Sequence, residues 1–247
     1  MTKTGVLAAV IFGGLAASIC LAEGDELRLT ASAWPPYVDV DAERNGFAVV
    51  LVSQALERAG YETSFTVTSW PESLENTEAG SFDVNVSLWR TDERAEALTF
   101  SEPYITNDIS FVKRAASDIN FSDRGDLVGL RIGVGEDFAY TAERYDTAGI
   151  DVQVGGSVDE NIGKLKAEEL DLVISDRRVA LYEINALGLA KSFEVMPNPL
   201  LTRGLRIAVS KQHPDHAGII DAFEAAVAEM RKDGSFNAIL ATFRVSE

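Results

Sequence analysis

Strand-like and helix-like segments alternate along this chain, and the alternation starts twice. Short stretches rich in Val, Ile, Thr and Phe are each followed by a longer stretch with helical spacing of apolar residues. The first series predicts strands at 27–32, 62–68 and 82–87, with helices at 47–58, from Ser69 to about 79, and from Thr91. The second predicts strands at 130–134, 151–154 and 170–175, with helices at 138–145, 157–169 and 176–187.

Local signals mark where several of these helices begin and end. Ser69 with Glu72, and Ser157 with Glu160, have the spacing of a capping box, in which each side chain binds the other residue's backbone N–H. Gly60 and Gly188 follow two helices as C-terminal caps. Such alternation predicts an α/β fold with largely parallel sheets covered by helices, in two units that divide near residues 107–117.

The C-terminal segment, from residue 205 onward, departs from this alternation of strands and helices. Residues 205–210 have the pattern of one more strand. A long amphipathic helix at 217–232 follows, ended by Asp233 and Gly234, and a short helix comes after it.

The N-terminus has the layout of a secretory signal peptide over residues 1–22. Lys3 precedes an uncharged, apolar run from Gly5 to Ala22, and the acidic sequence starts at Glu23. An uncleaved membrane anchor is the alternative, because the run is close to the ~20 residues that span a bilayer. Cleavage would remove Cys20, the only cysteine, and an exported chain without disulfides suits a bacterial periplasm.

The formal net charge of −17 argues against nucleic acid and anionic lipid as partners. The sequence has no glycine-rich nucleotide loop, no Gly-x-Ser-x-Gly, no His-Glu-x-x-His and no Cys-x-x-Cys. The two histidines, His213 and His216, are too few for a metal site, so neither metal nor cofactor is expected. Acid–base catalysis by carboxylates remains open, although no catalytic residue is assigned.

All three tryptophans lie one or two residues beyond the end of a predicted strand. They are Trp34, Trp70 and Trp89. Ligands of open α/β sheets bind outside the carboxyl ends of the strands, so these rings could line one pocket. The alternative is that each ring packs a loop onto its own unit, and Trp70 is the weakest candidate because it lies inside a capping box.

Arg94 and Asp176 are the charged residues whose positions point to a ligand. Arg94 is placed in the first turn of a helix, where it could hold a carboxylate beside free N–H groups, or simply pair with a nearby acid. Asp176 ends an apolar strand, where it could bind an ammonium group or merely cap the next helix. Together they would grip a zwitterion from two sides.

Several motifs, in this order and spacing, resemble family 3 of the bacterial extracellular solute-binding proteins, the periplasmic receptors of polar amino acid ABC transporters. The resemblance covers about residues 27–243. The motifs are Ala33-Trp-Pro-Pro-Tyr37, Asn45-Gly-Phe47, Gly80-Ser-Phe-Asp83, Thr91-Asp-Glu-Arg94, Phe100-Ser-Glu-Pro-Tyr104, Leu170-Asp-Leu-Val-Ile-Ser-Asp176, Leu205-Arg-Ile-Ala-Val209 and Lys232-Asp-Gly234.

The resemblance implies a fold similar to type II periplasmic binding proteins, with two α/β lobes joined by two crossing hinge strands. Lobe 1 would comprise residues 23–109 and 206–247, and lobe 2 residues 110–205. Arg94 matches the residue that holds the ligand carboxylate, and Asp176 the one that holds its ammonium group. The implied wall and backbone of the cleft are Trp34, Tyr37, Ser87, Leu88 and Trp89.

Two stretches depart from the family pattern. Trp89-Arg90 replaces small residues, and the loop from Gly135 to Tyr140 lacks the usual Gly-Thr or Gly-Ser. Asp137 and Tyr140 are therefore expected to face the ligand. These departures bear on the class of ligand and leave the fold expectation unchanged.

The function expected from all of this is that of a monomeric periplasmic receptor, which binds a small amino-acid-like solute and delivers it to a membrane ABC permease. Closure of the two lobes would bury the solute. Two alternatives share the fold: an enzyme resembling cyclohexadienyl dehydratase, and the ligand-sensing partner of a signalling receptor.

Overall fold

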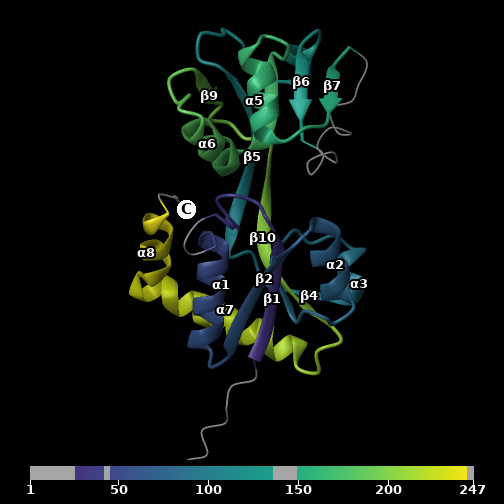
Figure 1. The fold of residues 1–247 in the computed structure, drawn as a ribbon, viewed down its shortest axis with the longest axis vertical. Coiled ribbons are helices and arrows are strands. Elements are labelled where there is room, and N and C mark those ends of the chain that lie inside the picture. The colour runs from purple at the N-terminus through teal and green to yellow at the C-terminus, as the bar shows by residue number, and fades with distance from the viewer. Residues whose placement is uncertain (1–25, 42–44, 136–148, 244–247) are drawn as a thin grey trace, which may run out of the picture.

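The computed structural model describes residues 26–41, 45–135 and 149–243. Figure 1 shows two groups of helices and strands, one above the other, joined by the long strands β5 (Ile105–Arg114) and β10 (Leu201–Ser210). This is the predicted α/β architecture of two lobes with two crossing strands. The lobe boundaries given above stay a prediction.

In the lower group, lobe 1, three strands pair in parallel, and the crossing strand β10 adds to them in the antiparallel direction. The central strand of the three is β1 (Glu26–Ser32), which pairs with β2 (Glu62–Thr68) on one side and β3 (Val84–Leu88) on the other. In the upper group, lobe 2, β6 (Arg131–Val134) lies between β7 (Asp151–Val154) and β8 (Leu172–Asp176), again in parallel. Two short strands complete the sheets: β4 (Leu98–Phe100) pairs with β10, and β9 (Phe193–Val195) pairs with β5.

Strand β10 belongs to both lobes because its two halves have different partners. Residues Leu201–Leu205 pair with Ile105–Ile109 of β5, and the half from Arg206 onward pairs with β3 and β4. Strand β5 continues into lobe 2, where it pairs with β8. Among the described residues, one path of strand pairs runs from β2 to β7, with β4 and β9 attached at its side, and β10 and β5 are the strands that carry it between the lobes.

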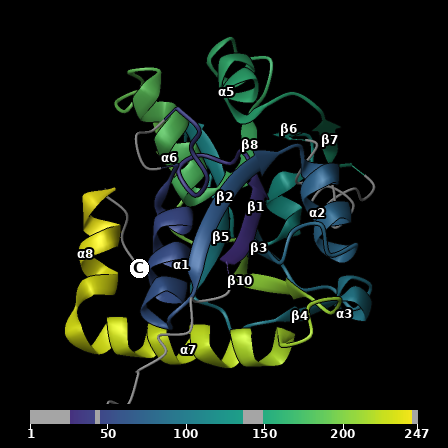
Figure 2. The ribbon, with the colours of Figure 1, turned by 60° about the horizontal axis from the view of Figure 1, so that its bottom comes forward.

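The helices cover the sheets much as the sequence predicted. Helix α7 packs against α1, β4 and β10, and α8 follows it (Figure 2). The helical segments are α1 (Phe47–Arg58), α2 (Trp70–Glu78), α3 (Arg94–Ala97), α5 (Val158–Lys166), α6 (Arg177–Ala186), α7 (His216–Asp233), α8 (Ser235–Thr242) and a short 3₁₀ turn, η1 (Arg124–Leu127). Both predicted capping boxes are present, at the starts of α2 and α5.

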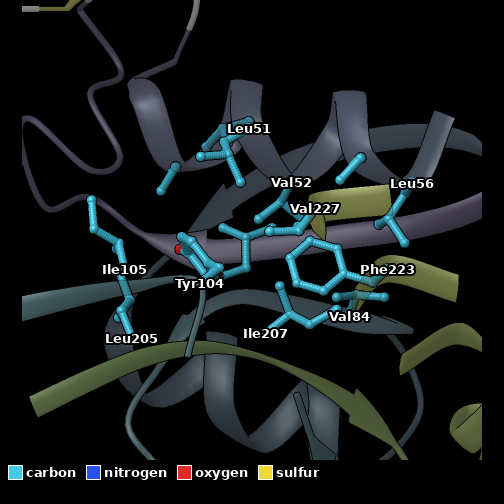
Figure 3. Packing of buried hydrophobic residues seen from close by; sticks show 14 of the residues in the cluster. Leu51, Val52, Leu56, Val84, Tyr104, Ile105, Leu205, Ile207, Phe223 and Val227 are labelled. Atoms are coloured by element: carbon cyan, nitrogen blue, oxygen red, sulfur yellow. The ribbon is translucent and has the colours of Figure 1, made fainter. Parts of the chain in front are cut away.

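Each lobe has a hydrophobic core of its own, although Val179 of α6 packs into the core of lobe 1. In lobe 1, the ring of Tyr104 packs with Phe223, Ile207 and Val84 between the sheet and helices α1 and α7 (Figure 3). In lobe 2, two clusters lie on the faces of the sheet, around Ile132 and Ile174 on one side and Ile162 and Val173 on the other. The lobe 1 core draws its residues from 27–105 and 205–240, together with Val179 of α6.

An arginine–aspartate pair recurs at the same place in each lobe. In lobe 1, Arg28 of β1 binds Asp83 through its backbone N–H, Nε and Nη2, at 2.8, 2.9 and 2.8 Å. In lobe 2, Arg131 of β6 binds Asp171 through the same three groups, at 2.9, 3.0 and 2.9 Å. Each aspartate directly precedes the strand that pairs with the strand of its arginine, so the ion pair fixes the register of two parallel strands.

We expect Asp171→Asn to make the free energy of unfolding depend less on pH between neutral and acidic conditions. Hydrogen bonds from Arg131 hold the pKa of Asp171 below its usual value. A carboxylate with a depressed pKa stabilises the fold above its unfolded pKa, and this contribution is lost as pH falls through the folded pKa. Denaturant melts from pH 7 to pH 2 should show wild type and variant differing most at neutral pH and converging below about pH 4.

The control is Asp92→Asn, because the Asp92 side chain is 98% exposed and its variant should follow wild type throughout. A stability difference between wild type and Asp171→Asn that is the same at every pH would contradict the prediction.

Some expectations were inaccurate or lie outside the described residues. Strands β4, β5 and β9 were not predicted from the residue pattern, and β10 begins four residues earlier than expected. The helix predicted at 138–145 lies outside the described residues. Within the described ranges, no helix combines the length and apolarity needed to cross a bilayer.

Candidate functional site

The loop after β1 is anchored on the first turn of α1. The N–H groups of Phe47 and Ala48 donate to the carbonyl oxygens of Pro36 and Tyr37, at 3.2 and 3.0 Å. These bonds satisfy donors that a helix start otherwise leaves open, and α1 has no side-chain cap. The loop is thereby held against α1, with the Tyr37 side chain fully buried.

Gly46 makes this close approach possible. Its φ is +90°, and a Cβ at this position would lie 2.5 Å from the carbonyl oxygen of Tyr37 and 2.7 Å from the backbone nitrogen of Asp39. Only glycine combines that backbone conformation with so little space. The Asn45-Gly-Phe47 motif therefore positions Tyr37.

We expect Gly46→Ala to lower the free energy of unfolding by about 2–3 kcal/mol, from backbone strain and overpacking together. Gly60→Ala is the matched control, because Gly60 also has a positive φ, +98°, but nothing lies within 4 Å of its would-be Cβ. Urea melts of both variants measure the difference. An equal loss in the two would mean that the contact with the Tyr37 loop contributes nothing.

Two of the three tryptophans meet where the lobes meet. The ring of Trp34 stacks on Tyr37, with centroids 4.3 Å apart and planes at 18°, and its edge contacts Trp89 at 6.1 Å. Both tryptophans are half-buried and pack against the lobe 1 core as well as a lobe 2 cluster. The aromatic residues at the ends of β1 and β3 thus form one surface between the lobes.

A buried polar network crosses from lobe 1 to lobe 2 beside these rings. The hydroxyl of Tyr37 donates to the Asp176 carboxylate, 3.0 Å from each oxygen. Asn107, on crossing strand β5, donates to the Tyr37 oxygen at 2.7 Å and to Asp176 at 3.1 Å. Its own amide oxygen accepts from the indole N–H of Trp89 at 2.7 Å. Burial raises the pKa of both Tyr37 and Asp176.

Asp176 also caps helix α6, which confirms one of its two predicted roles. Its Oδ1 accepts from the backbone N–H groups of Arg178 and Val179, at 2.8 and 3.1 Å. The side chain is completely buried. Its other role, binding a ligand ammonium group, stays a prediction.

Arg94 is the first residue of α3, close to both Trp89 and Trp70. Its Nη1 donates to the carbonyl oxygen of Trp89 at 2.8 Å, and its guanidinium carbon lies 5.1 Å from the centre of the Trp70 ring. Because α3 has only four residues, the argument from a helix dipole has little force. Trp70 is 39% exposed and joins the other tryptophans through Arg94.

The remaining predicted residues have mixed positions. Ser87 is half-buried at the end of β3, with its backbone N–H bonded to Asn85. The Leu88 side chain packs into a small lobe 1 cluster with Leu98 and Ala208, so only its backbone could serve a ligand. Asp137 and Tyr140 lie outside the described residues.

The sequence reasoning missed three residues that join the lobes. Asn107 connects Trp89 to Asp176, and Arg178 donates to the backbone oxygen of Thr106 at 2.6 Å. Tyr182 of α6 donates to Asp39 at 2.9 Å, a bond that raises the tyrosine pKa to about 12. None of them follows a local motif, and their partners are distant in the sequence.

An α/β fold of two lobes, with aromatic and charged residues gathered beside the crossing strands, defines the class of type II periplasmic binding proteins. The solved structure of an ancestral arginine-binding protein bound to arginine has this fold, with a TM-score of 0.71 at 22% identity, covering 89% of this chain and 98% of that one. The chain matches the family model of the bacterial extracellular solute-binding proteins, family 3, over residues 28–245, and it belongs to that family.

Curated relatives carry names of amino-acid-binding proteins. The L-cystine-binding protein TcyJ of Escherichia coli strain K12 is 25% identical over 201 residues, which cover 81% of this chain and 74% of the relative. The lysine/arginine/ornithine-binding periplasmic protein of the same strain is 25% identical over 249 residues, covering 95% and 94%. The predicted family and fold are thereby confirmed.

Proposed function

We propose that this protein is the periplasmic receptor of an ABC-type importer, and that it binds a small amino-acid-like solute between its lobes. The observation that carries the proposal is the meeting of Trp34, Tyr37 and Trp89 between the cores of the two lobes, next to Arg94 and Asp176. The names of the relatives support an amino acid as the class of solute.

In this proposal, each residue has a distinct task. The guanidinium group of Arg94 binds the solute carboxylate, since its planar fork matches a carboxylate bidentately. Asp176 binds the ammonium group from the other lobe. Trp34 and Trp89 enclose the apolar part of the solute, with Asp137 and Tyr140 approaching from lobe 2.

The rest of the proposal concerns the setting of this receptor. The signal peptide is cleaved before Glu23, and the protein acts as a monomer that passes its solute unchanged to a membrane permease. Strands β5 and β10 are the hinge, because they alone carry the strand hydrogen bonds between the lobes among the described residues.

A thermal-shift panel tests this function directly. Purified protein is heated with L-cystine, L-histidine, L-lysine, L-ornithine, L-arginine and L-glutamine, and with their mixtures at pH 7. A bound solute must raise the melting temperature by mass action. At a concentration a hundredfold above Kd, the free energy of unfolding increases by about 2.7 kcal/mol. Recovery of the solute in chemically changed form would favour an enzyme, and no shift with any amino acid would contradict the proposal.

A further inference from the structure

The carboxylate of Asp176 is saturated by donors from this chain. A carboxylate offers about four lone-pair sites for hydrogen bonds. Four donors occupy them here: the N–H groups of Arg178 and Val179, the amide of Asn107 and the hydroxyl of Tyr37. Because Asp176 is also completely buried, a solute ammonium group can reach it only by displacing one of these donors.

Three of the four donors are held in place by the helix or strand to which they belong. The N–H groups of Arg178 and Val179 belong to the first turn of α6, which Asp176 itself caps. Asn107 lies two residues from Ile109, the partner of Asp176 in the ladder between β5 and β8, and it is also bonded to Trp89. None of these three donors leaves Asp176 without breaking a helix start or a strand pairing.

Tyr37 differs from those donors because it comes from the loop after β1, in lobe 1. Its bond to Asp176 joins residues 139 positions apart, and the backbone of the loop that carries it is anchored on α1 of lobe 1. Lobe 2 holds this loop through side-chain contacts, such as the bond from Tyr182 to Asp39, which separation of the lobes would also break. A separation of the lobes by the hinge therefore removes the Tyr37 hydroxyl from Asp176 first. The vacated lone pairs are those that an ammonium group would take.

We propose that the Tyr37 hydroxyl competes with the solute ammonium group for Asp176 and so sets the selectivity of the site. This inference rests on the proposed function and adds to it. A hydrogen bond to a charged group has a strength that corresponds to about a ten- to hundredfold change in an equilibrium constant. Only those molecules in which the Tyr37 hydroxyl has left Asp176 can bind an ammonium group there. The apparent affinity for solutes with an ammonium group is therefore reduced by that factor.

The competition predicts that removing the Tyr37 hydroxyl strengthens the binding of solutes with an ammonium group and leaves the binding of solutes without one nearly unchanged. Tyr37→Phe keeps the buried ring but removes the hydroxyl, so an ammonium group meets an Asp176 with a vacant lone pair. A solute without an ammonium group gains nothing from that vacancy. The test therefore compares L-arginine with 5-guanidinopentanoate, and L-histidine with 3-(imidazol-4-yl)propanoate, since each pair differs only in the ammonium group.

Two further tyrosines supply matched controls. The hydroxyl of Tyr104 donates to the backbone oxygen of Val86 at 2.8 Å within the lobe 1 core, so Tyr104→Phe removes a buried bond that has no part in the site. Tyr182→Phe removes the bond between Tyr182 and Asp39, which also joins the lobes but leaves Asp176 saturated. Tyr182→Phe therefore separates the effect of an easier separation of the lobes from an effect on Asp176 itself.

The measurement is the dissociation constant of all four probes for wild type and the three variants, by titration calorimetry at pH 7. We expect Tyr37→Phe to lower Kd for L-arginine or L-histidine by about ten- to hundredfold, with less than a threefold change for the analogues. Tyr104→Phe should change neither member of a pair, and Tyr182→Phe should change both members equally.

An unchanged ratio of Kd values within each pair in Tyr37→Phe would overturn the inference, and so would weaker binding of the amino acid, which would make Tyr37 a direct solute contact. Failure of both wild type and Tyr37→Phe to bind any of the four probes would overturn it as well. The proposed function is judged separately by the wider thermal-shift panel, where any bound amino acid upholds it even if the ratio stays unchanged.

Discussion

Replacing Asp176 with alanine is expected to lower the free energy of unfolding by about 3–5 kcal/mol. The substitution removes the N-cap of α6, which costs about 0.5–2 kcal/mol. It also leaves the Tyr37 hydroxyl and the Asn107 amide as buried donors without their acceptor, at about 1–3 kcal/mol each. The expected total is below the simple sum because neighbouring contributions are not additive.

Denaturant melts at pH 7 give this loss directly, and Asp176→Asn is the informative second variant. Asparagine keeps one oxygen for the N–H groups of α6 but turns an N–H toward Asn107 or Tyr37, so an intermediate loss is expected. Ser157→Ala serves as the control, because Ser157 caps α5 at an exposed position. A loss for Asp176→Ala no larger than that for Ser157→Ala would mean that Asp176 is a helix cap and nothing more.

The second large effect is expected at Arg94. If its guanidinium group binds the solute carboxylate, Arg94→Lys should weaken binding by about ten- to hundredfold, because lysine cannot reproduce two parallel hydrogen bonds. The loss of the bond to the Trp89 carbonyl should cost only about 1 kcal/mol of stability. Affinity should therefore fall much more than stability.

Arg90→Lys is the matched control for Arg94. Arg90 lies in the same loop, four residues earlier, but its side chain is half exposed and pairs with the fully exposed Asp92. An exposed pair of this kind contributes little, so both affinity and stability should stay close to wild type. Calorimetry with the amino acid found in the thermal-shift panel measures both variants. Equal affinity of Arg94→Lys and wild type would remove the main reason to expect a carboxylate on the solute.

The sequence predicted the lobes well where local signals define an element. Helix α1 and strands β2 and β7 have the predicted bounds, because apolar periodicity and flanking glycines or polar residues mark their ends. Strand β5 lacks such signals: its residues mix polar and apolar side chains, and its partners are far away in the sequence. It was expected only from the resemblance to the family.

In the candidate site, too, local signals place some residues and not others. The tryptophans could be placed because each follows a strand, and Trp34 and Trp89 do meet. The contacts of Asp176 with Asn107 and Tyr37 span 69 and 139 residues, so no local pattern reveals them. One signal was overlooked. Leu-Arg-Leu at 27–29 and Leu-Arg-Ile at 130–132 lie at the central parallel strand of each lobe, and Phe82-Asp83 and Leu170-Asp171 supply the aspartates that pair with the two arginines.

The split partnership of β10 has a consequence for the order in which the chain can fold during synthesis. The lobe 1 core needs Ile207, Val209 and Phe223, which leave the ribosome late. The buried residues of the lobe 2 clusters all come from the stretch between Ile109 and Met196. Domains usually fold from the N-terminus onward as they are made. Here the nascent lobe 2 is complete first, and the lobe that starts the chain must wait for the final helices before its core can close.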